Sequence, residues 1–387
     1  MFRKMPFILM LIILAIVVLE PVIPLDIKEI CYAVSLSIKS LIIFLLPVII
    51  FGLLFNAAIN LAHNATRVIG TILVCVCISN FFSTFLSHYV GVWIYHFDLS
   101  ILLPKQTDGL QAAWAWELPK LIANDKAMFA GMALGIIGGL FKAKFANIVA
   151  VKLEWVVSKV LGSFAYLIPI FVAGFVMKLQ YDGVMSMIIR DYTLIFAIIA
   201  IAQFSYIALA YFLLNSCRVK DFFNSIKNML PAAISGFSTM SSAASMPLTI
   251  IGAENNAKNK ELAGSVIPAT VNVHLVGDCF AIPIFAYAVL KNYGMDEPSL
   301  WAYLTFTLYF VIAKFSVAAI PGGGIIVMLP ILEAYLGFNS PMMSLITALY
   351  ILFDPVITCA NVFGNGAFAK MMDRMMSSFK RKKSVIG

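Results

Sequence analysis

Charged residues are scarce in this sequence. Asp, Glu, Lys and Arg together make up 12% of its 387 residues, whereas 62% are hydrophobic. A soluble domain carries about 25% charged and about 45–50% apolar residues. The composition therefore excludes an ordinary soluble domain. Because a spanning helix uses about 20 residues, the chain has room for roughly eight to ten crossings of a membrane. The composition predicts a polytopic membrane protein.

The sequence also lacks cysteines placed for a disulfide framework or a metal site. Its six cysteines are scattered, mostly through apolar runs. Cys75 and Cys77 are two residues apart, so on a helix their side chains point to different faces. We expect the cysteines to be small hydrophobic residues of the interior.

The net charge of +8 is concentrated at the flanks of the apolar region. Arg3 and Lys4 precede the first apolar run, and the basic residues 380–383 follow the last. Basic flanks favour the cytoplasmic side, so both termini are predicted to be cytoplasmic and the number of crossings even. Basic residues at the ends of spans also argue against nucleic-acid binding. The segment Pro6–Leu25 has no small-residue cleavage site after it, and we interpret it as a retained helix.

Apolar runs predict six helices in the first part of the chain. Between the third and the fourth lies a more polar stretch, Lys105–Lys126, which carries Trp114 and Trp116. Tryptophans favour the membrane surface, so we interpret this stretch as an interfacial loop. The six predicted helices cover about residues 5–25, 35–60, 67–95, 127–146, 152–178 and 192–214.

Two later apolar segments are broken in the middle. Met229–Ile251 is rich in hydroxyl groups, and Trp301–Leu336 is interrupted at Pro321–Gly324 by a proline and three glycines. Such breaks suit a helical hairpin that enters and leaves the membrane on one side. Each precedes a long predicted span, at about 262–291 and 342–372. The chain is therefore predicted to be all-α, with eight transmembrane helices and two re-entrant hairpins, arranged as inverted repeats around a midplane site.

Polar residues line one face of the last predicted span. Asp354, Thr358, Asn361 and Asn365 follow one another at i, i+4, i+7 and i+11, which places them within about 60° on a helix. Polar groups in hydrocarbon face protein or a cavity. Thr and Asn also join helices together, and this structural alternative stays open. Pro355 predicts a kink. We expect Asp354 to bind a substrate ammonium.

These segments together resemble the dicarboxylate/amino acid:cation symporter family, the bacterial relatives of glutamate transporters. Four motifs carry the resemblance in order through residues 229–372, namely Ser238–Pro247, Ala269–Asn272, Ala319–Gly324 and Asp354–Asn365. The resemblance implies a secondary active amino acid symporter of the bacterial inner membrane, a homotrimer that works as an elevator. Its partners would be an amino acid and membrane lipids, with no nucleic acid and no enzyme activity.

The resemblance also implies a division of the chain. Residues 1–220 would be mainly a scaffold and trimerisation half, although some of its helices could join the transport core. Residues 221–373 would be the transport core, and residues 374–387 a basic cytoplasmic tail. The implied substrate-binding positions are Asp354, Thr358, Asn361, Ile357, Met240, Ser241, Ser242, Ile320 and Gly324.

One departure from the family pattern concerns the substrate. Members that carry acidic substrates place an Arg where this chain has Ile357. A buried substrate carboxylate without such a partner would be uncompensated. We therefore expect a small neutral amino acid, with its ammonium on Asp354. The alternative is a sodium-coupled symporter of dicarboxylates or acidic amino acids.

Further departures concern the coupling ion. By resemblance, Asn365 and His274 replace carboxylates, and Lys314 replaces a small hydroxyl residue that lends its carbonyl to sodium. Sodium prefers hard oxygen ligands, so its binding should be weak or absent. We expect no cofactor other than Na⁺ or H⁺ as coupling ion, and favour H⁺, since a buried lysine or histidine can exchange a proton near neutral pH. The candidates are Asn272, His274, Lys314, Asn365 and Asp278.

Purely structural roles for these residues stay open. Lys314 could extend to a membrane interface, and His274 could be a satisfied core group. Asp278 could pair with His274 one turn away. A serine protease built from Ser238 and His274 is a rival of another class, although no second glycine follows the serine. A binding protein, an exchanger or an uncoupled anion-conducting relative is a further rival.

Overall fold

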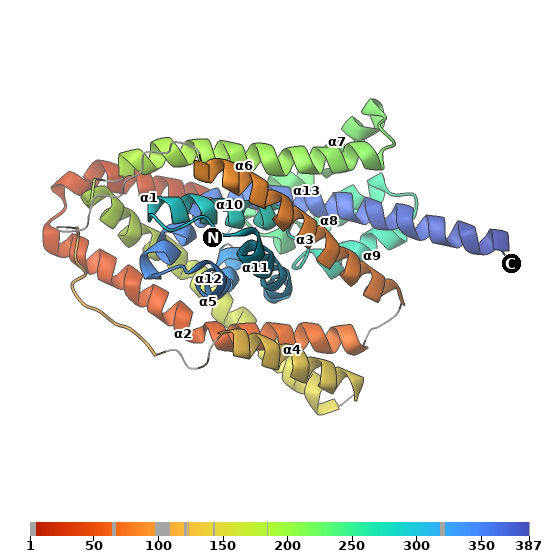
Figure 1. Ribbon diagram of the computed structural model, residues 1–387, viewed down its shortest axis with the longest axis horizontal. Coiled ribbons are helices and arrows are strands. Elements are labelled where there is room, and N and C mark those ends of the chain that lie inside the picture. Colours follow the sequence, from red (N-terminus) through yellow and green to blue (C-terminus); the bar gives the residue numbers. More distant parts are fainter. Residues whose placement is uncertain are drawn as a thin grey trace.

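The computed structural model of the protein describes residues 5–63, 67–96, 109–119, 122, 124–141, 144–183, 185–317 and 322–386. Within these residues all regular secondary structure is helical, as the all-α prediction requires (Figure 1). In chain order the elements are α1 (Met5–Leu19), the 3-10 turn η2 (Glu20–Val22), α2 (Leu25–His63), α3 (Arg67–His96), α4 (Asn124–Leu140), α5 (Lys144–Tyr181), α6 (Met185–Leu214), α7 (Val219–Thr239), α8 (Ser242–Asn256), α9 (Lys260–Thr270), α10 (Val276–Asn292), α11 (Leu300–Ala313), the 3-10 turn η3 (Lys314–Ser316), α12 (Gly323–Leu336) and α13 (Ser340–Ile386).

Several of these helices are long and apolar enough to cross a membrane. In the part of the chain that the structure describes, four stretches meet that length and hydropathy: Leu25–Asn56, Gly70–His96, Tyr192–Leu214 and Ser340–Ser377. Shorter apolar stretches lie at Phe7–Val22, Lys126–Leu140, Tyr166–Tyr181, Leu300–Ser316 and Gly323–Leu336.

Helices α2, α4 and α5 pack together at one edge of the molecule (Figure 1). Glycines allow α4 to lie directly on α2: a Cβ at Gly131 would be 2.7 Å from the Phe51 carbonyl oxygen, and one at Gly135 would be 2.6 Å from that of Phe55. Two small apolar clusters are centred on this group, one on Ile49 and the other on Phe55 and its neighbours. The group therefore has apolar clusters of its own, and the same helices also contribute residues to the main core.

The centre of the molecule is α10. All of its residues are buried except Lys291. Helices α3, α6, α12 and α13 pack against it, and α12 is almost as fully buried. Two helices from residues 1–220, α3 and α6, thus cover the core formed by the later helices.

Helices α7 and α8 form an antiparallel pair. Met240 has a left-handed backbone with φ 52°, and the Ser241 side chain caps α8 by accepting the Ala244 N–H at 3.2 Å. Gly252 of α8 allows close contact, since a Cβ there would be 2.8 Å from the carbonyl oxygen of Asn228 in α7. The turn lies in the hydroxyl-rich segment where the sequence predicts a hairpin tip.

A second pair, α11 and α12, surrounds the glycine-rich break. The 3-10 turn η3 ends α11, and α12 starts after Gly322, whose φ of 72° favours glycine. Ile320, a predicted site residue, lies outside the described residues.

The predicted span at 262–291 is wrong as one continuous helix. The chain leaves the helix between α9 and α10, at residues 271–275. Asn80 of α3 stabilises this break: its amide Nδ2 donates to the Val273 carbonyl at 2.6 Å, and its Oδ1 accepts the Leu275 N–H at 3.3 Å. Hydropathy cannot reveal the break, because the side chain that replaces the helical bonds comes from another helix.

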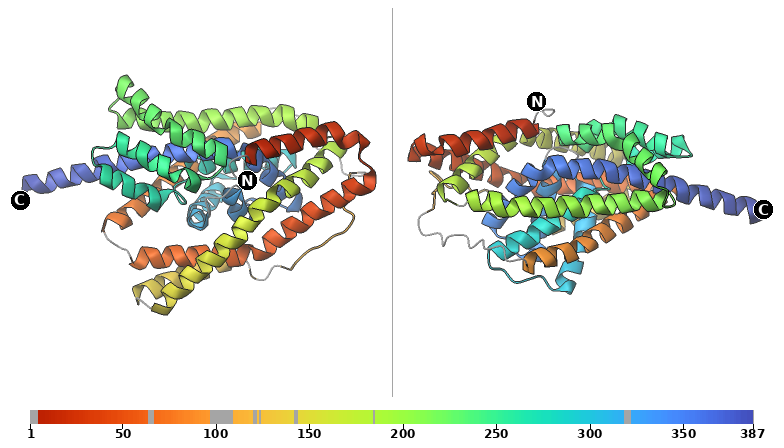
Figure 2. Two further views of the ribbon diagram at one scale, coloured as in Figure 1. Left: turned by 180° about the vertical axis from the view of Figure 1, so that it is seen from behind. Right: turned by 90° about the horizontal axis from the view of Figure 1, so that it is seen from above.

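The last helix, α13, is longer than the predicted 342–372 span. It runs for 47 residues, and its C-terminal part extends beyond the other helices (Figures 1 and 2). Helix α13 continues through Pro355. It includes most of the predicted basic tail.

Residues 109–119 of the predicted interfacial loop form no helix. They lie along α2, where Trp114 Nε1 donates to Ser37 Oγ at 3.0 Å and the Leu118 N–H donates to Ser40 Oγ at 2.8 Å. The cysteines of the described chain are unpaired; Cys279 is buried as predicted, whereas the prediction of an interior position is wrong for Cys217, which is exposed.

Candidate functional site

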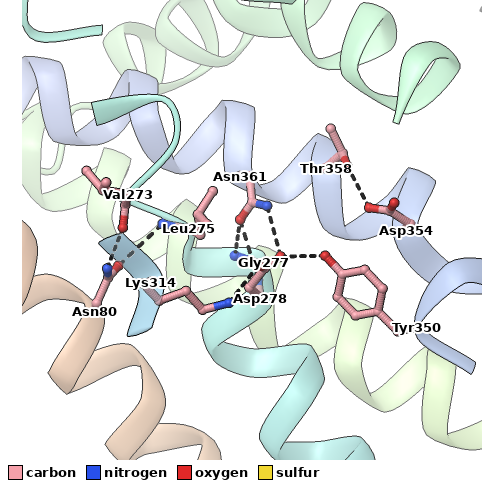
Figure 3. A network of polar contacts seen from close by, with 10 residues as sticks. All are labelled: Asn80, Val273, Leu275, Gly277, Asp278, Lys314, Tyr350, Asp354, Thr358 and Asn361. Carbon is pink, nitrogen blue, oxygen red and sulfur yellow. Dashed lines mark hydrogen bonds and ion pairs between the residues drawn. The ribbon is translucent and has the colours of Figure 1, made fainter. Parts of the chain in front are cut away.

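A buried ion pair lies where α10, η3 and α13 meet. Lys314 Nζ is 2.7 Å from Asp278 Oδ2, and Asp278 Oδ1 accepts hydrogen bonds from Tyr350 Oη at 3.0 Å and Asn361 Nδ2 at 3.1 Å (Figure 3). Lys314 is 0% and Asp278 1% exposed. The ammonium also lies 4.5 Å from the centre of the Phe310 ring. A buried ion pair is stable when hydrogen bonds also satisfy the carboxylate oxygens that the cation does not reach. Tyr350 and Asn361 supply those hydrogen bonds to Asp278.

Asn361 also accepts hydrogen bonds from the N-terminal end of α10. Its Oδ1 accepts the Gly277 N–H at 2.8 Å and the Asp278 N–H at 3.4 Å. The first N–H groups of a helix have no partner within the helix, so a side chain from α13 supplies one. Gly277 permits the approach, since a Cβ there would be 2.4 Å from the Ile357 carbonyl oxygen. Asn361 therefore joins the ion pair, the broken span and the last helix.

The first turn of α12 lies directly against this network. A Cβ on Gly324 would be 2.3 Å from Tyr350 Oη and 2.4 Å from Asp278 Oδ2. No side chain fits at that position. The glycine-rich break thus has a steric role as well as a conformational one.

Asp354 accepts hydrogen bonds from neutral groups. Its Oδ2 accepts the Gly322 N–H at 2.8 Å and its Oδ1 accepts the Thr358 hydroxyl at 2.9 Å, while the residue is 3% exposed. Among the described residues, the ion pairs include none to Asp354. The structure therefore brings Asp354 and Thr358 to the glycine-rich break, and the carboxylate has no cationic partner there.

The remaining predicted substrate positions lie around this point. Ile357 is fully buried, as are Met240 and Ser242 at the α7–α8 turn. Helix α7 reaches α13 at the level of Thr358, since a Cβ on Gly236 would be 3.4 Å from the Thr358 carbonyl oxygen. Both helical pairs thus pack against α13, near Thr358 and Asp354.

Four of the five predicted ion-coupling residues are buried, and one is exposed. Lys314, Asp278 and Asn365 are all buried, and Asn365 Nδ2 donates to the Asn361 carbonyl at 3.1 Å. His274 is buried in the break, with its Nε2 2.8 Å from Ser79 Oγ. Its Nδ1 and the Asn365 Oδ1 have no hydrogen-bond partner among the described residues. Asn272 is exposed.

Three alternatives left open by the sequence are wrong. Lys314 does not reach an interface, because it is fully buried and paired. Asp278 does not pair with His274, because its oxygens bond Lys314, Tyr350 and Asn361. A serine–histidine dyad is not formed either.

The hydrogen bonds of the two protease candidates run elsewhere. The Ser238 hydroxyl donates to the Ile234 carbonyl at 2.8 Å, within its own helix. The His274 imidazole is bonded to Ser79. Neither group is positioned to activate the other.

Sequence reasoning missed Asn80 and Tyr350. Tyr350 precedes Asp354 by four residues and so shares its helix face. Asn80 belongs to a stripe of polar residues in α3 at i, i+3, i+4 and i+7, all of them 0% exposed. Such a stripe in an apolar helix is the same signal that singled out the last span. The stripe consists of Asn80, Ser83, Thr84 and Ser87.

Comparison with known proteins gives one family and several distant relatives. Residues 126–375 match the model of the sodium:dicarboxylate symporter family. The chain is 25% identical over 185 residues to the proton/sodium-glutamate symport protein of Bacillus subtilis, a match that covers 46% of this chain and 43% of the relative. It is 24% identical over 208 residues to excitatory amino acid transporter 1 of Rattus norvegicus, with 53% of this chain and 37% of the relative covered. The chain thus spans less than half the length of these relatives.

Proposed function

The chain belongs to the sodium:dicarboxylate symporter family, and we propose that it carries a small neutral amino acid across the cytoplasmic membrane together with protons. The family consists of membrane transporters, so the protease interpretation is wrong. The observation that carries the proposed substrate class is the buried Asp354, whose hydrogen bonds come from a backbone N–H and a hydroxyl. A substrate ammonium would supply the missing charge.

The same surroundings disfavour an acidic substrate. A second substrate carboxylate would need a cation, and Ile357 offers a buried alkyl group instead. The nearby Lys314 ammonium is already neutralised by Asp278. An acidic side chain would therefore lose its hydration without gaining a partner. A neutral side chain avoids that cost.

Coupling to protons is supported by the same ion pair. The Lys314 ammonium, paired with Asp278, lies in the core at a position that by resemblance lends its carbonyl to sodium. The Asn365 and His274 side chains carry no fixed negative charge to bind sodium in its place. We propose that Lys314, Asp278 or His274 exchanges the coupling proton during the cycle.

Binding is proposed to act through the Gly322–Asp354 contact. A substrate ammonium at Asp354 would share the carboxylate with the Gly322 N–H, and we propose that the start of α12 shifts to admit the substrate. The two helical pairs would act as re-entrant hairpins that close over the substrate, with Met240, Ser241, Ser242 and the segment from Ile320 to Gly324 at their tips. Glycines at the second tip permit that shift.

We further propose the family's elevator mechanism in a homotrimer, with eight spans and both termini cytoplasmic. The two apolar clusters within α2, α4 and α5, apart from the main core, support a scaffold in residues 1–220. The packing of α3 and α6 on α10 supports their moving with the transport core of residues 221–373.

One observation favours a second candidate. The two relatives are named as a glutamate symport protein and an excitatory amino acid transporter, and the first name includes both proton and sodium. A sodium-coupled symporter of acidic amino acids or dicarboxylates is therefore the alternative. An exchanger or uncoupled relative would bind the same substrates without accumulating them.

Uptake into proteoliposomes separates these candidates. An imposed proton gradient, with choline as the only other cation, should drive accumulation of a labelled neutral amino acid in the unaltered protein. Asp354→Asn should abolish it and leave the unfolding temperature near its original value, because the amide still accepts the Gly322 N–H. Asp26→Asn, an equivalent change at an exposed acid in the first turn of α2, is the matched control and should transport normally.

Three results would each overturn a part of the proposal. Accumulation that requires sodium and disappears on replacement by choline rejects proton coupling. Accumulation of glutamate in preference to neutral amino acids rejects the substrate class. Undiminished uptake by Asp354→Asn would remove Asp354 from the binding site.

A further inference from the structure

A pocket of about 320 Å³ lies away from the candidate site, between α2, α5 and the start of α13. Residues 109–112 of the loop before α4 and Tyr293 after α10 complete its wall. The polar and charged side chains that line it include Tyr32, Lys39, Lys178, Asp182, Ser340 and Ser344.

Lys39 is the unusual group in this wall. The residue is 7% exposed, yet its ammonium donates only to neutral oxygens: the Ser340 carbonyl at 2.5 Å, Ser340 Oγ at 2.6 Å and Ser344 Oγ at 2.7 Å. Among the described residues no ion pair reaches it, and the carboxylates of Glu117 and Glu333 act on it from longer range. A buried ammonium without a counter-ion is costly.

The other charges of the pocket cancel. Lys178 Nζ is 2.8 Å from Asp182 Oδ2, and Asp182 Oδ1 accepts the Leu110 N–H at 2.8 Å. This pair is committed to joining α5 to the loop. Among the charged side chains that line the pocket, Lys39 is therefore the one without an opposite charge in contact.

The start of α13 adds to that positive potential. The helix begins at Ser340 and is 47 residues long, and the N-terminal end of a helix carries a partial positive charge. A lysine at that end is electrostatically unfavourable. An anion in the pocket would neutralise both, and the hydroxyls of Ser340 and Ser344 would also be able to donate to it.

We propose that this pocket binds the phosphodiester group of an anionic phospholipid. A phosphodiester carries a single negative charge, which matches the charge left by Lys39. Lys39 lies within the apolar stretch Leu25–Asn56, where membrane lipids are the abundant anions. Leu36, Leu179 and Leu345 line the same pocket and provide contacts for the apolar part of the lipid. The lipid would bridge α2 and α5 to α13, and the site is independent of the proposed transport function.

The test uses the full chain purified in a neutral detergent, to which short-chain phosphatidylglycerol is added while thermal unfolding is followed. A ligand that binds the folded state raises the unfolding temperature in a saturable way. Phosphatidylglycerol should do so, whereas inorganic phosphate and phosphatidylcholine of the same chain length should have much less effect. Lys39→Gln should weaken the apparent affinity for phosphatidylglycerol by about tenfold or more, because a charge-assisted contact is lost.

Lys152→Gln is the matched control, since Lys152 is an exposed lysine of α5 outside the pocket. It should respond like the unaltered protein. If Lys39→Gln does not fold, Ser344→Ala keeps the lysine and should weaken the affinity by several-fold through loss of one hydroxyl contact. If Lys39→Gln and Ser344→Ala bind phosphatidylglycerol with the affinity of the unaltered protein, the proposal is overturned. An equal shift with inorganic phosphate would also overturn it, by making the pocket a site for free anions.

Discussion

Lys314 Nζ and Asp278 Oδ2 are 2.7 Å apart, although the two residues are 36 positions apart in the chain and neither is more than 1% exposed. The pair joins the end of α11 to the start of α10, next to the first turn of α12. Because both charges are excluded from water, each depends on the other. An ion pair without net charge is thereby built into the core of the molecule.

Replacing one member of this ion pair should lower the free energy of unfolding more than replacing both members. Lys314→Met leaves the Asp278 carboxylate buried without a cation, which costs about 3–5 kcal/mol. Asp278→Asn combined with Lys314→Met leaves a neutral amide that still accepts from Tyr350 and Asn361. Thermal unfolding of both single variants and of the double variant measures the coupling. Additive losses would show that the two charges do not interact.

Gly324→Ala should destabilise the start of α12. The new Cβ would lie 2.3 Å from Tyr350 Oη and 2.4 Å from Asp278 Oδ2, so the first turn must move. Adding Tyr350→Phe removes the hydroxyl and should recover part of the loss. Gly162→Ala in α5 is the control, because nothing lies within 4 Å of its Cβ position, and it should be neutral or slightly stabilising. Equal unfolding temperatures for the two alanine variants would contradict this prediction.

Asn80→Ala should loosen the break between α9 and α10. It leaves the Val273 carbonyl and the Leu275 N–H without their partner, at a cost of about 1–3 kcal/mol for each buried group. Hydrogen exchange should rise most at the Leu275 amide. Ser83→Ala, at another buried position of the same stripe, removes a hydroxyl that donates only within α3, to the Ser79 carbonyl, and should have little effect on that amide. Unchanged exchange at Leu275 in Asn80→Ala would argue that the backbone maintains the break by itself.

Ile357→Arg should make the protein responsive to glutamate. Ile357 is 0% exposed, so the guanidinium would be buried unpaired and several kcal/mol would be lost. A ligand carboxylate offsets that cost, and glutamate should therefore raise the unfolding temperature of the variant but not of the unaltered protein. Ile346→Arg places the same guanidinium at another fully buried position of α13. This variant should also be destabilised, and glutamate should not raise its unfolding temperature. Rescue of both variants alike would indicate a non-specific effect of glutamate.

The prediction of the site depended on periodicity within single helices. Asp354 and Thr358 are one turn apart, so their common face could be predicted, and the structure joins them by a hydrogen bond of 2.9 Å. The same reasoning would have found Tyr350 one turn earlier. The break at residues 271–275 was not predicted, because the groups that stabilise it, Asn80 and Asn361, belong to distant helices.

The amino-acid sequence alone determined that the protein is a helical membrane protein of this transporter family, since hydropathy, charged flanks and ordered motifs are properties of the chain itself. Only the tertiary structure decided the partners of the buried polar groups: Lys314 with Asp278, Gly322 with Asp354, and Lys39 with the start of α13. In an apolar environment a charge is stable only where a specific partner reaches it, and that partner is chosen by helix packing.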